Sequence, residues 1–551
     1  MKQLSSISEA HYPYGLILLW AILTLPSLGM APLFDYDETI YAQTAIDMMR
    51  LGEWIVPTAN GIQFFEKPPF TYYLMDLSFL AFGENAFAAR LPSALFTLFT
   101  ALLIFRFGNK IHSPSFGLSA ALIFLTMFEV GLLGHAAILD AVLNFFIAAC
   151  LLYYFLWRQF GEKKHALIAA AMMGAAVSIK GPVGAVVPLL IIIVDRLLAR
   201  DLGATLCKIP WFSCLGLFLI TATPWYLMIL AMHGPQFLYE FIVVHNIGRA
   251  MNPMQGHGGG WHYYFVVFIA SVLPWLAWFV WASRQTWQQR ASNDTLISIA
   301  KLGLTWTLLV ILLFTFAQTK LPHYISAIYP GTALMIAAAL FHFGNKEYVS
   351  KSIYWGTALL LLPLALLLLT FPFLYPYLTE LVHHPRAVAI VSQGIHPPQW
   401  ISFLGAMLLM AIIWLGWHSR RPSGSHVFRF AVTGIILQCA LFTGLGTFAG
   451  KLIQAPTMKI AAAVKQLPAD MPIYNYNLNN APSISFYAQR PYQVVLGQAG
   501  EKMLSAIKKP HAIVMRSESL KLLKHLHGTA PAINQGGYLL YVITPDSKQG
   551  L

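Results

Sequence analysis

Charged residues are scarce in this sequence. Asp, Glu, Lys and Arg make up 10% of its 551 residues, whereas 57% are hydrophobic, and the mean hydropathy is +0.62. A soluble domain carries about 25% charged residues. The shortage argues against a soluble globular protein and predicts an integral membrane protein.

Cysteine is also rare, and several familiar motifs are missing. The four cysteines are Cys150, Cys207, Cys214 and Cys439; three lie in apolar runs and Cys207 lies beside a basic loop. Such placement argues against a disulfide framework. We find no zinc motif of the HExxH kind, and no inverted repeat typical of transporters.

The charge that is present is mostly positive. The formal net charge is +13, which in a soluble protein would suggest a nucleic-acid partner. Here the basic residues fall in short loops between apolar runs, so the positive-inside rule accounts for most of them. We therefore expect a lipid bilayer as the surroundings and no nucleic acid.

Long apolar runs dominate residues 1–450. A membrane-crossing helix needs roughly 20 apolar residues, and the runs show no strand-like alternation, so helices are expected rather than a barrel. The first run is interpreted as a retained span, not a removed signal. The sequence predicts thirteen spans: 14–33, 86–105, 114–134, 138–157, 166–180, 182–199, 210–232, 262–283, 298–317, 324–343, 353–376, 399–417 and 427–449.

The loops and the tail complete the predicted architecture. Basic residues concentrate in alternate loops, which places the N-terminus in the cytoplasm and, after an odd number of spans, residues 451–551 outside. β-like runs at 472–476, 492–496, 511–515 and 538–543 alternate with helical runs near 456–466 and 499–507. We predict an all-α polytopic bundle (1–450) with a small C-terminal α/β domain (451–551) that covers or supports its outer face.

The first outer loop, residues 34–85, is the most densely charged part of the N-terminal half. Residues 39–51 have helical periodicity, with Ala42, Ala45 and Ile46 on one face and Asp47 off it; this predicts a helix lying on the membrane surface. A second interfacial segment is expected over 69–82. A charged loop beside a bilayer is costly unless it lies in water or in a site.

Three carboxylates are candidates for chemistry. Asp37 and Glu38 precede the predicted surface helix, and Asp140 opens the fourth span. Each position also suits a helix cap, because a side-chain oxygen there accepts from free backbone N–H groups. The alternative is a carboxylate that faces a polar substrate at the membrane boundary. The topology puts all three on the outer side.

Isolated cations on the same side form a second candidate group. Lys67, Lys180, Arg249 and Lys320 are each nearly alone in their loops. Several cations at a membrane surface suit a phosphate group, and hydrogen-bond donors lie nearby at Tyr41, His323 and Tyr324.

Metal binding is the weaker alternative. Glu66, His245, His257 and His262 lie on the outer side, but their spacing matches no recognised zinc motif. We expect no required cofactor, and a structural divalent metal such as zinc at Glu66, His245 and His257 rather than a catalytic one.

An ordered set of motifs carries a family resemblance. DETIYA, GEWIVP, FFEKPP, LDAVLNF, SIKGP, HNIGR and KLPHYI follow one another along the chain. In this order they resemble the polyprenyl-phosphate-dependent glycosyltransferases of the C type, which include protein O-mannosyltransferases. The likeness is strongest to the bacterial transferases that attach aminoarabinose to lipid A.

The resemblance implies a reaction and roles for residues. The donor would be undecaprenyl phosphate carrying 4-amino-4-deoxy-L-arabinose, and the acceptor a lipid A phosphate on the periplasmic face of the bacterial inner membrane. The product would confer resistance to polymyxin and other cationic peptides. Asp37 matches the family's essential acid, Lys67 the lysine after the glutamate, and Asp140 the acid that opens the fourth span. Residues expected around the lipid phosphate are matched by Arg249, Lys320 and Tyr324.

Other functions remain open at this level. A related transferase acting on protein hydroxyls or on another glycan would use Asp37 as a general base. A lipid transporter and a non-catalytic membrane scaffold also fit the spans. We expect a monomer, and inversion of the anomeric centre by in-line attack.

Overall fold

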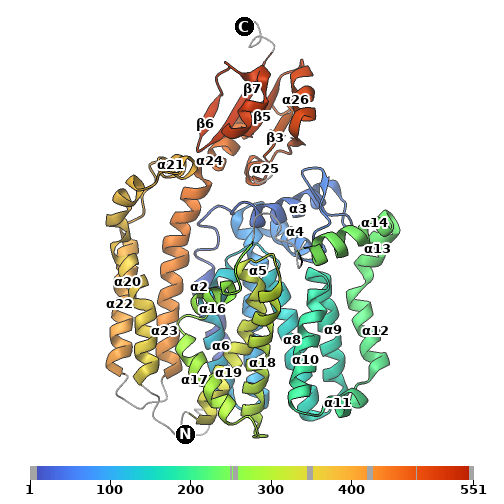
Figure 1. Cartoon of the computed structure of the whole chain (residues 1–551), viewed down its shortest axis with the longest axis vertical. Coiled ribbons are helices and arrows are strands. Elements are labelled where there is room, and N and C mark those ends of the chain that lie inside the picture. Colours follow the sequence, from blue (N-terminus) through green and yellow to red (C-terminus); the bar gives the residue numbers. More distant parts are fainter. Residues whose placement is uncertain are drawn as a thin grey trace.

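The structure is a computed structural model that describes residues 9–248, 251, 258–343, 351–418, 426–478 and 481–544. A bundle of helices carries a sheet domain above one end, and a layer of short elements lies between them (Figure 1). The predicted all-α bundle with a small C-terminal α/β domain is confirmed. The four cysteines are free.

The bundle consists of helices that follow one another with short connections. In chain order they are α2 (Tyr12–Thr24), α5 (Ala86–Ile111), α6 (Pro114–Leu125), α7 (Phe128–Gly134), α8 (Asp140–Phe160), α9 (Lys163–Lys180), α10 (Val183–Leu198), α11 (Leu202–Lys208), α12 (Trp211–Ala222), α13 (Pro224–His233), α14 (Pro235–Leu238), the π-helix η1 (Tyr239–Gly248), α16 (Tyr263–Ser271), α17 (Leu276–Gln288), α18 (Thr295–Phe316), the 3-10 helix η2 (Pro322–Ile328), α19 (Tyr329–Phe343), α20 (Lys351–Glu380), α21 (Pro385–Val391), α22 (Trp400–His418), α23 (His426–Gln438), the π-helix η3 (Cys439–Gly446) and α24 (Thr447–Gln466).

Each predicted span contains a helix, but several are short or bent. Within the described ranges, seven segments are long and apolar enough to cross a membrane, or up to eleven if each of four sharply bent helix pairs is one span. The pair α6–α7 bends by 73° and the pair α16–α17 by 108°. An apolar run carries no signal for such a bend, so the count of thirteen stays a prediction.

The outer layer is built from α3 (Asp37–Leu51), α4 (Phe70–Phe82) and a hairpin of β1 (Thr58–Ala59) and β2 (Ile62–Gln63). Both predicted helices of this layer are present. The hairpin turns at Asn60 (φ +51°) and Gly61 (φ +77°). Two consecutive positive φ values are those of a type I′ turn, for which Asn-Gly is the preferred sequence.

The hairpin explains how a charged residue of α3 is buried. Asp47 was predicted to lie off the apolar face of the helix, and it is buried by other contacts. Its carboxylate accepts hydrogen bonds from Gln43 Nε2 at 2.7 Å and from the backbone N–H of Asn60. The hairpin thus covers the side of α3 that carries Asp47, and the location of this helix on a membrane surface stays a prediction.

The tail domain is a five-stranded mixed sheet in the order β4-β3-β5-β7-β6. β3 (Ile473–Tyr476) pairs in parallel with β4 (Gln493–Val495) and β5 (His511–Arg516), while β7 (Tyr538–Ile543) is antiparallel to β5 and to β6 (Ile533–Gln535). The four predicted strands are present. The edge strand β6, which is only three residues long, was not predicted.

Helix α24 joins the bundle to the sheet without a break. It runs through the predicted boundary at residue 450 as far as Gln466. Its last turns bury Ile460, Ala461 and Val464 against the sheet. The helices α25 (Ser483–Ala488) and α26 (Gly497–Ala506) complete this domain with the 3-10 helices η4 (Ser517–Leu522) and η5 (Lys524–Leu526), and α25 faces the outer layer (Figure 1).

Candidate active site

A small cavity lies where the outer layer meets the bundle. It collects segments that are far apart in sequence: the start of α3, the chain after the hairpin, the end of α9 and the start of η2. It is lined by Tyr36, Asp37, Ile40, Tyr41, Phe64, Glu66, Lys67, Lys180, Leu321, His323 and Tyr324. The structure thus brings together seven of the residues singled out from the sequence: Asp37, Tyr41, Glu66, Lys67, Lys180, His323 and Tyr324.

Asp37 presents an exposed carboxylate to this cavity. It is the first residue of α3, and the N-cap position is Tyr36, which makes no side-chain cap. Across the described ranges the Asp37 carboxylate takes part in no hydrogen bond and no ion pair. The Asp37 side chain therefore does not cap the helix, and its negative charge is available to a ligand.

Asp140 is buried behind the cavity and binds a lysine that lines it. Asp140 begins α8, and Lys180 ends α9; Lys180 Nζ lies 2.7 Å from Asp140 Oδ1. His323 Nε2 lies 3.9 Å from Asp140 Oδ2. Burial of a charge pair is tolerated when the partners are close and hydrogen-bonded. Asp140 therefore fixes the ammonium of Lys180 at the cavity wall.

The η2 helix supplies further lining residues beside Lys180. Tyr324 places its ring 5.0 Å from Lys180 Nζ, a cation–π contact, and the ring of His323 lies against that of Tyr324. Ser326 Oγ lies 3.4 Å from Asn144 Oδ1 of α8, which fixes η2 against the bundle. The end of α9 and the start of η2 are thereby held together.

Lys67 adds a second buried cation. Its side chain is buried in the segment between the hairpin and α4, where Pro68 and Pro69 restrict the backbone. The charge of Lys67 acts on both Asp140 and His323. Lys67 and Lys180 thus bring two cations to the cavity, and Asp37 and Glu66 bring two carboxylates to it.

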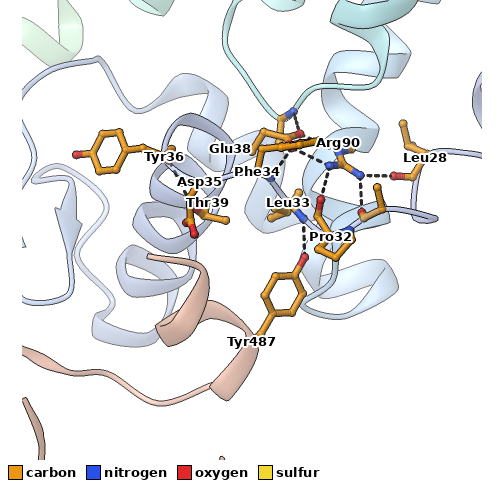
Figure 2. A network of polar contacts seen from close by, with 12 residues as sticks. Leu28, Pro32, Leu33, Phe34, Asp35, Tyr36, Glu38, Thr39, Arg90 and Tyr487 are labelled. Atoms are coloured by element: carbon orange, nitrogen blue, oxygen red, sulfur yellow. Dashed lines mark hydrogen bonds and ion pairs between the residues drawn. The ribbon is translucent and has the colours of Figure 1, made fainter. Parts of the chain in front are cut away.

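Glu38 has a different role from the predicted catalytic one. Its carboxylate accepts from Arg90 Nε at 2.8 Å, Arg90 Nη2 at 2.7 Å, and the backbone N–H groups of Phe34 and Ala137. Arg90 also donates to the carbonyls of Leu28, Ala31 and Pro32 (Figure 2). Glu38 is therefore fully used in holding the chain before α3, and it does not line the cavity.

Arg90 was missed because it lies inside an apolar run. It occupies α5 with 4% relative exposure. A charged residue within a predicted span requires a partner. That rule was the signal that could have identified the Arg90–Glu38 pair from the sequence.

Lys320 also departs from its predicted role. Its ammonium donates to the carbonyls of Thr315 at 2.7 Å and Ala317 at 2.8 Å, at the C-terminal end of α18. It lies 5.4 Å from the ring centroid of Tyr264. Carbonyls that end a helix attract a cation, so Lys320 is held there and does not line the cavity.

The remaining predicted residues fall partly outside the described ranges. Arg249 and His257 are not among the described residues, and neither is the side chain of His245. Among the residues that are described, no group of three or more His, Cys, Asp or Glu could hold a metal ion. The zinc site therefore stays a prediction.

Asp35 was not singled out from the sequence. Its carboxylate accepts from Thr39 Oγ1 at 2.6 Å and from the backbone N–H and hydroxyl of Ser483 in α25. Burial raises the pKa of Asp35 to about 6. This contact ties the tail domain to the loop that leads into Asp37.

Known proteins resemble this chain in sequence and in fold. The family model of dolichyl-phosphate-mannose-protein mannosyltransferases matches residues 66–228, a range that includes Lys67, Asp140 and Lys180. The undecaprenyl phosphate-alpha-4-amino-4-deoxy-L-arabinose arabinosyl transferase of Serratia proteamaculans is 30% identical over 328 residues, which is 59% of this chain and 58% of that protein. The resemblance inferred from the motifs is confirmed.

A relative with the same name from Erwinia tasmaniensis is 27% identical over 376 residues, 67% of this chain and 66% of that protein. The chain thus spans about 58% of the length of the first relatives it matches.

Solved structures share the fold. ArnT from Cupriavidus metallidurans bound to undecaprenyl phosphate matches with a TM-score of 0.77 and 20% identity, over 97% of each chain. The archaeal oligosaccharyltransferase AglB from Archaeoglobus fulgidus matches with a TM-score of 0.52 and 10% identity, over 94% of this chain and 70% of that one.

Proposed function

We propose that the chain is an inverting glycosyltransferase that moves 4-amino-4-deoxy-L-arabinose from undecaprenyl phosphate to a phosphate of lipid A. The observation that carries the proposal is the single cavity in which the unpaired carboxylate of Asp37 meets the cations Lys67 and Lys180. The names of the similar proteins support the donor and the sugar. The site would lie on the periplasmic side of the inner membrane, as the loop charges predict.

The cations suit the leaving group. The bond that breaks joins the anomeric carbon to a donor phosphate oxygen, and the electron pair stays on that oxygen. Positive groups placed where negative charge grows are usually the largest contribution to such catalysis. Lys67, and Lys180 held in place by Asp140, would supply that charge, while His323 and Tyr324 offer further polar contacts.

The carboxylate of Asp37 suits the sugar. An acceptor phosphate is already an anion, so its oxygen attacks the anomeric carbon without a strong base. Asp37 would bind the amino group of the sugar or stabilise positive charge that develops at the anomeric carbon, as carboxylates do in glycosidases. Asp140 acts as a positioning residue in this scheme, because its oxygens are turned to Lys180.

Substrate binding requires the cavity to open. Its free volume is about 20 Å³, which is enough for about one water molecule. The segment that carries Phe64, Glu66 and Lys67 follows the hairpin and contributes one wall. We propose that this segment moves outward to admit the sugar phosphate.

The deciding experiment is mass spectrometry of lipid A from cells with and without the gene, and with the Asp37→Asn variant. Addition of one aminopentose by the intact gene alone is the expected result. The matched family model is that of dolichyl-phosphate-mannose-protein mannosyltransferases, so a protein hydroxyl is the alternative acceptor that this experiment tests. Unmodified lipid A together with altered glycoproteins would reject the lipid A acceptor and make Asp37 a general base toward a hydroxyl.

A lipid transporter is the competing function from another class. The charged cavity lies beside α3 at one end of the bundle (Figure 1), whereas transporter sites lie near the bilayer midplane. Net movement of the polyprenyl lipid across vesicles in the absence of acceptor would favour transport over transfer.

A further inference from the structure

A second and larger cavity lies at the opposite end of the bundle. Helix α10 begins three residues after Lys180 and runs away from the candidate active site. The end of α10 that is far from the candidate active site lies near the end of α17 and the start of α18 (Figure 1). Residues of these three helix ends line a cavity of about 940 Å³. By the loop charges this end is predicted to face the cytoplasm. The proposed glycosyl transfer uses no residue of this cavity.

The lining of this cavity carries an excess of positive charge. Its charged members are five cations and two carboxylates, which gives a net charge of +3: Arg158, Arg196, Arg200, Arg290 and Lys301 against Asp195 and Asp201. A cavity whose lining has an excess of positive charge attracts anions.

Two of the cations are already paired. Asp195 Oδ2 lies 2.6 Å from Arg196 Nη2 and 3.1 Å from Arg158 Nη1, and it accepts from the hydroxyl of Tyr154 at 2.9 Å. Arg196 Nη1 also contacts Asp201 Oδ2 at 2.8 Å. These four charged groups form a closed network that balances its own charge.

The excess charge therefore belongs to Arg200, Arg290 and Lys301. Lys301 Nζ donates to the carbonyls of Arg290 and Ser292, neutral groups that orient the ammonium but leave its charge uncompensated. The guanidinium of Arg290 lies over the ring of Trp287 at 5.1 Å. Within the described ranges no carboxylate lies within ion-pair distance of these three residues.

Above the charged end, the cavity wall is apolar. Leu304, Leu308 and Leu312 follow Lys301 along α18 and lie on one face, because they are spaced four residues apart. Leu308 and Leu312 are 53% and 52% exposed. From Lys301 to Leu312 the helix rises about 16 Å, a length that reaches from a membrane surface into the hydrocarbon.

We propose that this cavity binds an anionic phospholipid of the bilayer. The phosphate of its headgroup contacts Arg200, Arg290 and Lys301, and one acyl chain lies along Leu304, Leu308 and Leu312. A small anion would use the cations but not the leucine wall, and an uncharged lipid would use the wall but not the cations. Both features in one cavity match a lipid that carries negative charge.

The test measures lipid binding to the purified full-length chain in detergent. Phosphatidylglycerol is the probe and phosphatidylcholine the zwitterionic control, with bound lipid counted by native mass spectrometry and Tm followed in parallel. Arg200→Gln with Arg290→Gln removes two exposed cations of the cavity. Arg106→Gln with Lys208→Gln is the matched control, because both residues are exposed at the same end and do not line the cavity.

The wild type should bind phosphatidylglycerol in preference to phosphatidylcholine and gain Tm from it. Each basic residue near a membrane surface contributes about fivefold to the affinity for anionic lipid, so the cavity variant should bind about thirtyfold more weakly. The control variant should bind like the wild type. In the wild type, raising NaCl from about 0.05 M to about 0.5 M should weaken binding, a readout that depends on no variant.

Three results would overturn the proposal. Equal binding of the two lipids would indicate an unselective lipid annulus. Equal losses in the cavity and control variants would indicate general surface charge. If inorganic phosphate without lipid gave the full gain in Tm, and if Leu308→Ala and Leu312→Ala left that gain unchanged, the cavity would be a site for small anions.

Discussion

Asp37 and Glu38 are neighbours in sequence, and we predict opposite outcomes when each loses its charge. The substitution Glu38→Gln removes the partner of Arg90, which has 4% relative exposure, and introduces an N–H group among the donors Arg90, Phe34 and Ala137. Leaving one buried charge unpaired costs about 3–5 kcal/mol. This is a large share of the about 5–15 kcal/mol by which proteins are stable.

Asp37→Asn is the matched control. The Asp37 carboxylate is exposed and lies at the cavity, so its change should alter the free energy of unfolding by at most about 0.5 kcal/mol. Sugar transfer should fall by at least about a hundredfold, the lower end of the range for loss of one group that stabilises transition-state charge. Glu38→Gln should instead lower Tm and yield, while transfer per folded molecule stays within a few-fold of wild type.

The assay is thermal unfolding in detergent combined with transfer measured per folded molecule. A further variant, Glu38→Met with Arg90→Met, removes both charges; it should recover part of the stability that either single change loses, because no buried charge is left alone. If Glu38→Gln kept the wild-type Tm and lost transfer, Glu38 would act on the substrate and the structural role assigned to it would be wrong.

Other perturbations test the remaining parts of the site. Lys180→Met should lower both the transfer rate and Tm, because it removes the ion-pair partner of buried Asp140. Adding Asp140→Asn to this variant should restore Tm but not transfer. Recovered transfer in the double variant would show that Lys180 has no part in the mechanism. Gly61→Val should strain the hairpin turn by about 1–2 kcal/mol, because φ at this position is +77°. The strain should displace the Lys67 segment and lower the rate of transfer measured at saturating donor. Wild-type kinetics in this variant would show that the turn does not position Lys67. Burial raises the pKa of Asp35 from 3.8 to about 6, so the folded protein holds this proton more tightly than the unfolded chain does. Protonated Asp35 therefore contributes its full stabilisation of the folded state below pH 3.8, and this contribution is lost as the pH rises through about 6. Asp35→Asn should flatten that part of the Tm–pH profile, and an unchanged slope would assign the pH dependence to another group.

The sequence was sufficient for features that depend on local pattern. The surface helix, the helix that follows Pro69, and the strands of the tail appear in their own hydrophobic periodicity. The grouping of Asp37, Lys67 and Lys180 followed from topology alone, because loops on one side of a membrane lie near the same surface. Topology, however, predicts only the side of the membrane on which a residue lies, and not which side chains it contacts.

What the sequence could not supply were the distances between side chains. Asp37 and Glu38 are adjacent acids ahead of the same helix, but successive residues of a helix point about 100° apart, so one faces the cavity and the other faces Arg90. Lys320 lies next to the cavity-lining Leu321, yet its ammonium binds carbonyls at the end of α18. The Asn60-Gly61 hairpin was not predicted, although Asn-Gly is the preferred sequence of its type I′ turn.

The tail domain explains how an irregular loop can form a precise site. Helix α25 contacts the outer layer through Ser483 with Asp35, and through the hydroxyl of Tyr487, which accepts from the backbone N–H of Leu33 at 2.7 Å (Figure 2). It also contacts the hairpin, where Ser485 Oγ lies 2.6 Å from Asn60 Oδ1.

These contacts fall on two segments outside the long helices: the chain that leads into Asp37, and the hairpin that precedes Lys67. Both segments carry residues of the cavity. Segments with few backbone hydrogen bonds open at low free-energy cost, and α25 adds restraints from outside without lining the cavity, as far as the described residues show. Because the same contacts must loosen if the Lys67 segment is to move and admit a substrate, substitutions at Ser485 should change donor binding more than the rate at saturating donor.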